Sequence, residues 1–398
     1  KLLEEVMRDY RRAGLNLPKA ERDEVERLRK ELSQVSTDFD KNITDARKEL
    51  KFTKAQLEGV PESFLKQVKT GDDEYTVMAN ITFHIITVMD TCKVEETRRK
   101  LLFERENLAR EKNIELLDHI LKLRHQIAQK LGYKNWADYQ IEPKMAKNGQ
   151  TALSFLEDLK RGLEPKFRAE LAELQKLKAE ETGDPNAKIE IWDWRYYTNE
   201  LKKRRYNVDA EQLRVYFPYQ RVLEGMFNIY QHIFGLTFTE IEPPYKWTDD
   251  LKLYAVTDSE SGEPLGLFYL DMFPRVCKDN HFAQFGIIEG TLLPDRKYQR
   301  PTVALICNFP PPSDDRPSLL SHSEVETLFH EFGHAMHSIL TRAKHARFSG
   351  ASVPRDFVEA PSQMLENWVW DKKVLDTFAA RYDNPNEKIP ESILEKLE

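Results

Sequence analysis

Hydrophobic residues recur at spacings of three and four along most of the chain, which is the pattern of a helix with one buried face. The pattern predicts two charged helices in residues 1–50, broken near Gly14 and Pro18. Further helices are predicted at residues 94–131, 151–181 and 218–235. The helix after Pro18 has a hydrophobic seam like that of a paired helix. Because this seam covers barely three heptads, we favour a helical hairpin inside the fold over a coiled coil that dimerises.

Shorter apolar segments bounded by turn residues indicate strands. Residues 253–256 and 265–270 are predicted to form a hairpin with a long turn, and residues 302–309 a buried strand that Pro310 ends. A short strand is also predicted at residues 75–81. An extended peptide laid along an exposed sheet edge gains main-chain hydrogen bonds whatever its side chains, but the pattern does not indicate which strand forms that edge. The expected fold is mainly α, with a small β-sheet.

Residues 330–334 have the sequence His-Glu-Phe-Gly-His, the H-E-x-x-H motif, within a segment of helical period. Side chains four residues apart lie on one face of a helix, so His330 and His334 can hold one zinc ion. Glu331, about 100° further round the helix, lies beside the ion, where its carboxylate takes a proton from a zinc-bound water. Chance alone produces this motif in on the order of one in a hundred chains of this length. The motif alone is therefore weak support for hydrolytic chemistry, and a third zinc ligand elsewhere in the chain would strengthen it.

The helix around the motif has its own sequence signals. Ser323 and Glu326 have the Ser-x-x-Glu form of a capping box, which predicts a helix over residues 323–341. Apolar residues follow at spacings of three and four, as on a face buried in a core. Gly333 costs roughly 1 kcal/mol in a helix interior relative to alanine. We therefore expect another segment to pack closely against the backbone at this glycine.

Catalytic zinc takes three protein ligands and keeps one position open. The metzincin arrangement is excluded, because it needs Gly at 337 and His at 340, where this chain has His337 and Leu340. A carboxylate on a following helix is the other common arrangement, and Glu359, 25 residues after His334, is the candidate. Taken alone, Glu359 is an ordinary first-turn glutamate favoured by the helix dipole. Beside an H-E-x-x-H motif we interpret it as the third ligand.

The neighbours of Glu359 are assigned supporting roles. Asp356 is predicted to be the N-cap of its helix. Ligand histidines need acceptors that fix their tautomers, and Gln363 and Glu366 lie one and two helical turns beyond Glu359. Both are candidates for that role.

Residues 330–334 together with residues 356–370 resemble the thimet oligopeptidase, neurolysin and saccharolysin group of the M3 zinc metallopeptidases. Weaker similarity includes residues 192–197 and 269–275. The resemblance maps the zinc ligands of the family onto His330, His334 and Glu359, and its catalytic glutamate onto Glu331. It implies one zinc ion per chain and a metalloendopeptidase that hydrolyses internal bonds of short peptides. It also implies a neurolysin-like zincin fold, in which two helical halves flank a deep channel.

Members of this family extend further on both sides, so we expect this chain to be an internal part of such an enzyme, with the fold incomplete. Residues 1–205 are expected to form part of the channel walls, and residues 206–398 the catalytic region, in domains that are discontinuous in sequence. The glycine-rich loop, histidine and tyrosine that steady the tetrahedral intermediate in the family lie beyond Glu398. Losing one oxyanion donor typically costs about 100-fold or more in rate, so the activity of this chain by itself is left open.

Composition narrows the choice of compartment and partners. The chain has 398 residues with 32% charged residues and no apolar run near the 18 residues of a membrane span, so we expect a soluble protein that binds no membrane. Its net charge of −7 argues against nucleic-acid binding. Cys92, Cys277 and Cys307 are far apart and not at metal-ligand spacing, which fits a reduced compartment. We expect a cytoplasmic monomer acting on short peptides, with a mitochondrial location as the alternative.

Another class of function competes with this interpretation. A helical scaffold or binding protein, with structural zinc or none, would contact its partner through the seam in residues 20–50. Structural zinc usually has four protein ligands, which separates it from catalytic zinc. A thermolysin-like or aminopeptidase gluzincin would share the metal chemistry, but the residues that flank Glu359 favour the oligopeptidase group.

Overall fold

The computed structural model describes residues 1–206, 213–275, 278, 281–312 and 316–394. The chain forms two compact units, Lys1–Arg205 and Tyr206–Glu398. The first unit is mainly helical and also contains one two-stranded antiparallel sheet, β1 (Glu49–Phe52) and β2 (Tyr75–Met78). Its helices are α1 (Leu2–Ala13), α2 (Lys19–Asp45), α3 (Glu62–Val68), α4 (Thr82–Thr91), α5 (Glu95–Glu106), α6 (Arg110–Lys130), α7 (Trp136–Ile141), α8 (Gly149–Thr182) and α9 (Trp194–Tyr206), with a 3-10 turn at Ala55–Leu57.

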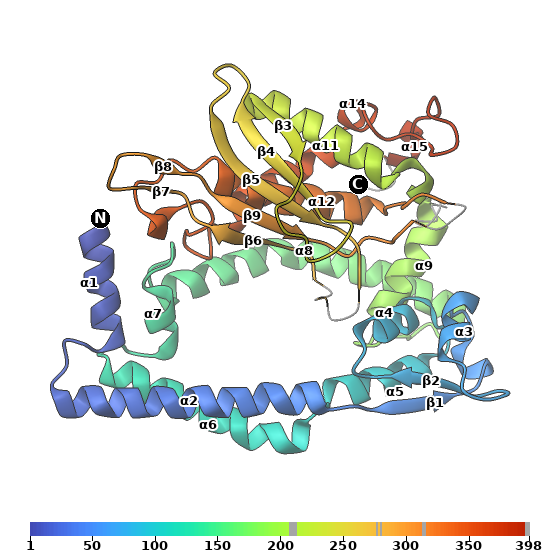
Figure 1. The fold of residues 1–398 in the computed structure, drawn as a ribbon. Coiled ribbons are helices and arrows are strands. Elements are labelled where there is room, and N and C mark those ends of the chain that lie inside the picture. The colour runs from blue at the N-terminus through green and yellow to red at the C-terminus, as the bar shows by residue number, and fades with distance from the viewer. Residues whose placement is uncertain (207–212, 276–277, 279–280, 313–315, 395–398) are drawn as a thin grey trace. The chain divides into compact units, whose positions relative to one another are not determined.

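Helices α2 and α6 pack side by side, as Figure 1 shows. Leu28 of α2 is buried together with Leu123 and Ile127 of α6, so the seam packs inside the fold as expected. The seam of α2, however, packs against α6. The predicted hairpin would have paired α2 with α1, its neighbour in sequence. The predicted single helix over residues 94–131 is wrong, because α5 and α6 are separate helices. The backbone turns at Ala109, which adopts a left-handed conformation with φ of 56°.

A buried ionic network holds α5, α8 and the start of α9 together. Arg98 is fully buried and donates hydrogen bonds to Asp193 at 2.6 Å and to the backbone carbonyls of Cys92 and Trp192 at 2.7 and 3.1 Å. Lys178 of α8 donates to the other carboxylate oxygen of Asp193, also at 2.6 Å. Asp193 is fully buried and is the shared acceptor of both cations. Its charge therefore offsets two buried positive charges.

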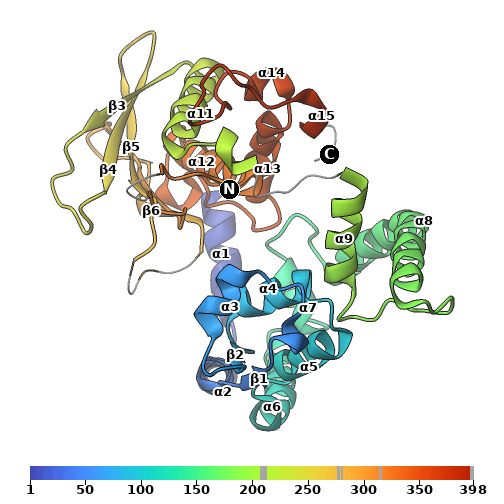
Figure 2. The same ribbon diagram turned by 90° about the vertical axis from the view of Figure 1, so that its right-hand side faces the viewer.

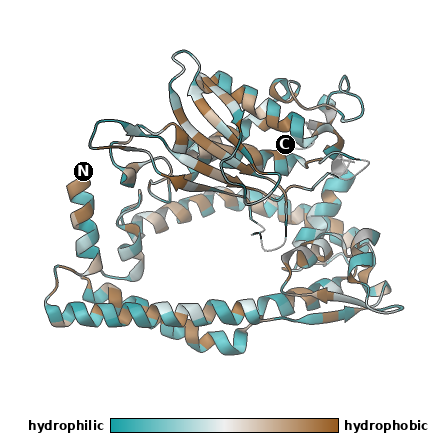
Figure 3. Ribbon diagram, viewed as in Figure 1, coloured by the Kyte–Doolittle hydropathy of each residue, from teal (hydrophilic) through white to brown (hydrophobic). Residues whose placement is uncertain are grey.

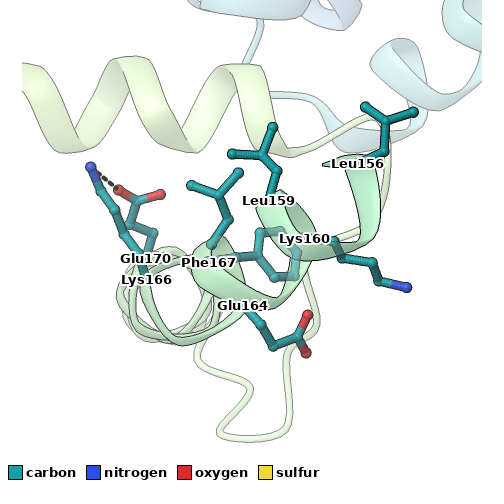
Figure 4. A pocket seen from close by; sticks show the side chains of 8 residues that line it. Leu156, Leu159, Lys160, Glu164, Lys166, Phe167 and Glu170 are labelled. Atoms are coloured by element: carbon teal, nitrogen blue, oxygen red, sulfur yellow. Dashed lines mark ion pairs between the residues drawn. The ribbon is translucent and has the colours of Figure 1, made fainter. Parts of the chain in front are cut away.

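Helix α8 carries an exposed apolar face. Leu156, Leu159, Leu163 and Phe167 are each about half exposed and line a shallow hollow of about 590 Å³ along the helix (Figure 4). The other side chains around the hollow are lysines and glutamates. No histidine or cysteine is among the described residues that line it, so they offer no imidazole or thiolate metal ligand.

The second unit contains a five-stranded sheet with helices on one side, as Figure 2 shows for α11 and α12. Its strands are β3 (Leu236–Ile241), β4 (Lys252–Asp258), β5 (Pro264–Asp271), β6 (Ala283–Ile288) and β9 (Thr302–Ile306), and a separate pair is formed by β7 (Thr291–Leu292) and β8 (Tyr298–Gln299). Its helices are α11 (Tyr219–Phe234), α12 (His322–Ile339), α13 (Glu359–Glu366), α14 (Lys372–Leu375) and α15 (Glu391–Leu394), with 3-10 turns at Arg214–Tyr216, Ala346–Phe348 and Asn367–Val369.

The order of the strands in this sheet is β3-β4-β5-β9-β6. All neighbours are antiparallel except β5 and β9, which are parallel. Strand β9 is almost continuously buried and hydrophobic (Figure 3), because it lies inside the sheet and against α12. The predicted hairpin of β4 and β5 is present, and β9 is shorter than the predicted strand. Strand β6, which forms one edge, was not predicted.

The core of this unit lies between the sheet and its helices. Phe227 of α11, Phe268 of β5 and Phe332 of α12 are packed ring against ring, with centroid distances between 5.1 and 5.7 Å. Aromatic pairs in such geometry contribute about 0.5–1.5 kcal/mol each beyond their buried area. This packing fixes α12 on the sheet and thereby fixes residues 330–334.

The ends of β5 and β9 are tied together by a second buried ion pair. Asp271 is 1% exposed and accepts hydrogen bonds from Trp247, Arg275 and Lys278 at 2.7–2.8 Å. Lys278 also donates to the backbone carbonyls of Phe273 and Cys307, which follow the two strands. Burial alone would raise the pKa of Asp271, but the hydrogen bonds from Arg275, Lys278 and Trp247 outweigh it and lower the pKa.

The lowered pKa of Asp271 predicts an acid-sensitive contribution to stability. A carboxyl group whose pKa is lower in the folded state stabilises the protein above its unfolded pKa of about 3.9, and this contribution is lost as the pH falls through the folded pKa. Asp271→Asn should therefore make the free energy of unfolding less dependent on pH below pH 4, as measured by urea unfolding between pH 5 and 2. The exposed variant Asp249→Asn is the control. Equal slopes for Asp271→Asn and the wild type would contradict the prediction.

No helix within the described ranges combines the length and the apolar character needed to cross a membrane.

Candidate metal centre

The helix that carries the H-E-x-x-H motif is α12, which starts at His322 after the N-cap Ser321. The capping box is formed by Ser321 and Glu324, so the predicted box at Ser323 and Glu326 is wrong by two residues. Both pairs have the Ser-x-x-Glu form, and the tertiary structure selects the first, whose Glu324 also pairs with Arg214. The helix itself agrees with the predicted range to within two residues at either end.

Helix α13 crosses α12 at Gly333. A Cβ atom at position 333 would lie 2.9 Å from the Cα of Ser362 and 3.3 Å from Leu365, closer than side chains tolerate. The close neighbour expected from this glycine is therefore α13. Helix α13 begins at Glu359 with Val358 as its N-cap and no side-chain capping bond, so the predicted N-cap role of Asp356 is wrong. Glu359 thus lies in the first turn of a short helix packed against α12.

This packing brings His330, His334 and Glu359 together. The Nε2 atoms of the two histidines are 3.2 Å apart, and Oε2 of Glu359 lies 3.2 Å from that of His330 and 3.0 Å from that of His334. With metal–ligand bonds of about 2.0–2.2 Å, the edges of a tetrahedral zinc site measure about 3.3–3.6 Å. Three donors with nearly this spacing fit a metal ion that would contact all of them. The donor set of two imidazoles and a carboxylate suits zinc among other transition metals.

The number of ligands differs between structural and catalytic metal sites. Among the residues that the structure describes, this group contains three metal-ligating side chains and no fourth. Structural zinc sites use four protein ligands, whereas catalytic sites use three and leave a position for water or substrate. A group of three ligands has the number that catalytic sites use.

Glu331 lies next to the group without belonging to it. It is 8% exposed, and burial raises the pKa of its carboxyl above the ordinary value. The nearby His330 and a backbone hydrogen bond from Gln284 lower this pKa, while the nearby Glu359 raises it further. A buried carboxyl with a raised pKa is a better proton acceptor than an exposed one, which suits a general base.

Further contacts orient the first histidine. Nδ1 of His330 lies 2.5 Å from Oε1 of Glu366, on the side of the ring away from Nε2. A carboxylate on Nδ1 fixes the tautomer that leaves Nε2 free to bind a metal. Of the two predicted candidates for this role, the structure brings Glu366 to His330, whereas Gln363 is exposed. Burial lowers the pKa of His334, which favours the neutral imidazole that metal binding requires.

His337 does not join the group. It lines a largely apolar hollow of about 620 Å³ between α12, α13 and the loop after α12, together with Met336, Leu340 and Met364. Its Nδ1 is buried and lacks a hydrogen-bond partner within the described part of the chain. His337 therefore belongs to the packing behind the candidate centre.

Strand β6 is the feature of this site that sequence patterns missed. It lies at the edge of the sheet next to α12, and Gln284 reaches the Glu331 carboxylate through its backbone. Phe285, Ile287 and Ile288 are about half exposed there. The strand contains a glycine and lacks regular alternation, so periodicity alone gave no signal for it.

Several known proteins are similar to this chain in sequence. Residues 88–398 match the model of Peptidase family M3. Over its whole length the chain is 39% identical to saccharolysin of Saccharomyces cerevisiae and 33% identical to oligopeptidase A of Escherichia coli. Over 98% of its length it is 34% identical to the thimet-like oligopeptidase of Dictyostelium discoideum. The chain spans 58–60% of the length of these relatives.

Proposed function

Because the chain belongs to peptidase family M3, we propose that it carries the metal centre of a zinc-dependent oligopeptidase, which hydrolyses internal bonds of short peptides. The observation behind the proposal is the convergence of His330, His334 and Glu359 next to the buried Glu331. These side chains all belong to the second unit, so we propose residues 206–398 as the catalytic region. A part in the wall of a substrate channel stays a prediction for residues 1–205.

We propose one zinc ion per chain, held by His330, His334 and Glu359. When bound in such a site, zinc lowers the pKa of a water molecule to about 7 and polarises the carbonyl of the scissile bond. Glu366 would hold His330 in the tautomer that presents Nε2.

Glu331 is proposed as the general base. Its carboxylate accepts a proton from the attacking water and later gives it to the nitrogen of the leaving amine. Its burial supports this role, because a raised pKa brings the carboxyl closer to the pH at which both transfers are efficient.

The peptide substrate is proposed to lie along β6. This strand is at the sheet edge, it runs beside the helix that carries Glu331, and its side chains are partly exposed. A peptide paired with an edge strand is held by main-chain hydrogen bonds that do not depend on its side chains. Tolerance of many sequences around the cleaved bond is the expected consequence.

We place the protein in the cytoplasm, as a monomer that binds peptides and neither nucleic acid nor membranes. Cys92 and Cys307 are buried free thiols, which supports a reduced compartment, and Cys277 lies outside the described residues. Relatives include mitochondrial intermediate peptidases, so a mitochondrial location is the alternative.

Metal analysis together with a peptide assay tests the proposed function. We expect about one zinc per chain by elemental analysis, loss of cleavage of an internally quenched peptide after treatment with a chelator, and recovery on adding zinc. A helical scaffold without a metal site would bind no zinc, and a structural zinc would be bound without an exchangeable water. Cleavage that persists in the metal-free protein would contradict the proposal.

A further inference from the structure

Glu359 differs from the two histidines in how firmly the protein holds it. Its side chain is 50% exposed, compared with 21% for His330 and 11% for His334. A glutamate side chain loses rotamer freedom when it is held in one orientation. Packing alone therefore does not keep this carboxylate in a position to bind a metal.

One side chain besides the histidines bonds the Glu359 carboxylate in the part of the chain that the structure describes. Oγ of Ser362 lies 3.2 Å from Oε2 of Glu359, the oxygen that faces both imidazoles, and 2.9 Å from the Glu359 backbone carbonyl. Ser362 is fully buried, so water does not compete for its hydroxyl. The hydroxyl thus links the carboxylate to the first turn of α13.

Position 362 is also the contact point between the two helices. Its Cα and Cβ atoms lie 2.9 and 3.5 Å from the place where a Cβ on Gly333 would be, and Ser362 is fully buried, so the two helices are in close contact at this position. Alanine would meet this steric requirement as well as serine. The hydroxyl therefore does more than fit the helix contact, because its proton faces two acceptors, the Glu359 backbone carbonyl at 2.9 Å and the Glu359 carboxylate at 3.2 Å.

We propose that Ser362 is a positioning residue for the metal centre: its hydroxyl holds the Glu359 carboxylate in the orientation that binds the metal. This inference rests on the proposed function and extends it to how the third ligand is presented. The two histidines lie on a long helix, where they are less exposed than Glu359, and Glu366 already orients His330. The third ligand comes from the start of a short helix and is oriented by a hydrogen bond from within that helix.

Ser362→Ala tests the proposal, since it removes the hydroxyl and keeps the helix contact. We expect the zinc affinity, measured by competition with a chromogenic chelator, to fall about ten- to hundredfold. The melting temperature of the metal-free protein should stay near that of the wild type. The absorption bands of the cobalt-substituted protein should change in position or intensity, because the carboxylate is no longer held.

Ser338→Ala is the matched control, because Ser338 is a buried serine on α12, four residues beyond His334, that is not a member of the metal-ligating group. It should bind zinc as the wild type does. Wild-type zinc affinity and cobalt spectrum in Ser362→Ala would overturn the role of Ser362 and leave the proposed function intact. A wild-type protein that binds no zinc would overturn both. A loss of affinity in Ser338→Ala equal to that in Ser362→Ala would show a general packing effect and also overturn the role.

Discussion

Replacing Glu331 with glutamine is expected to lower kcat for peptide cleavage by about 10²–10⁴-fold, the usual contribution of a general base. This corresponds to about 3–5 kcal/mol of transition-state stabilisation. Glutamine has nearly the same size as glutamate but accepts no proton at neutral pH. Because Glu331 lies beside the metal-ligating group and is not a member of it, the variant should keep its zinc. Elemental analysis and steady-state kinetics on the same preparation check both expectations.

The control for this variant is Glu326→Gln on the same helix. Glu326 accepts a hydrogen bond from the indole of Trp370, which a glutamine oxygen can also accept, so cleavage should be unchanged. Glu331→Gln with the rate of the wild type would refute the general base. Loss of zinc together with activity would instead assign Glu331 to the ligands.

Asp193→Asn is expected to lower the free energy of unfolding of the first unit by about 3–5 kcal/mol, because it leaves Arg98 buried without a counter-charge and leaves Lys178 paired with Glu95 alone. Arg98 is fully buried and has no access to water. A typical protein is stable by only about 5–15 kcal/mol, so the loss is large. Urea unfolding followed by tryptophan fluorescence and circular dichroism measures it, and Trp192 is adjacent in sequence and reports locally.

Glu96→Gln is the comparison for the buried pair. Glu96 pairs with Arg99 on the surface of α5, where both side chains are more than half exposed, and exposed pairs contribute little. Its unfolding should match that of the wild type. If Asp193→Asn unfolded at the same urea concentration as Glu96→Gln, the network would contribute nothing to the stability of the unit.

Family membership was predicted from residues 330–334 and 356–370, and it is confirmed by the match of residues 88–398 to the family model. The prediction was possible because these motifs lie within short, contiguous segments. The mainly helical fold with a small sheet was also predictable, since helical periodicity is a local property.

The predictions were wrong where the sequence allows two local structures that are nearly equivalent. Ser321 and Ser323 both start a Ser-x-x-Glu pattern, and the pairing of Glu324 with Arg214 accompanies the first. Residues 94–131 have continuous helical periodicity, yet the left-handed residue Ala109 separates α5 from α6, which packs against α2. In both cases a contact distant in sequence decided the outcome.

By itself, the sequence determined that His330 and His334 share one helix face with Glu331 beside them, because a spacing of four residues fixes their geometry in any helix. Only the tertiary structure decided that Glu359 meets them, that Glu366 and Ser362 orient the ligands, and that β6 is the sheet edge beside Glu331. These relations depend on the distance between segments, which is set by the packing of α13 on Gly333 and of α12 on the sheet. The spacing of hydrophobic residues along the chain gives no information about such distances.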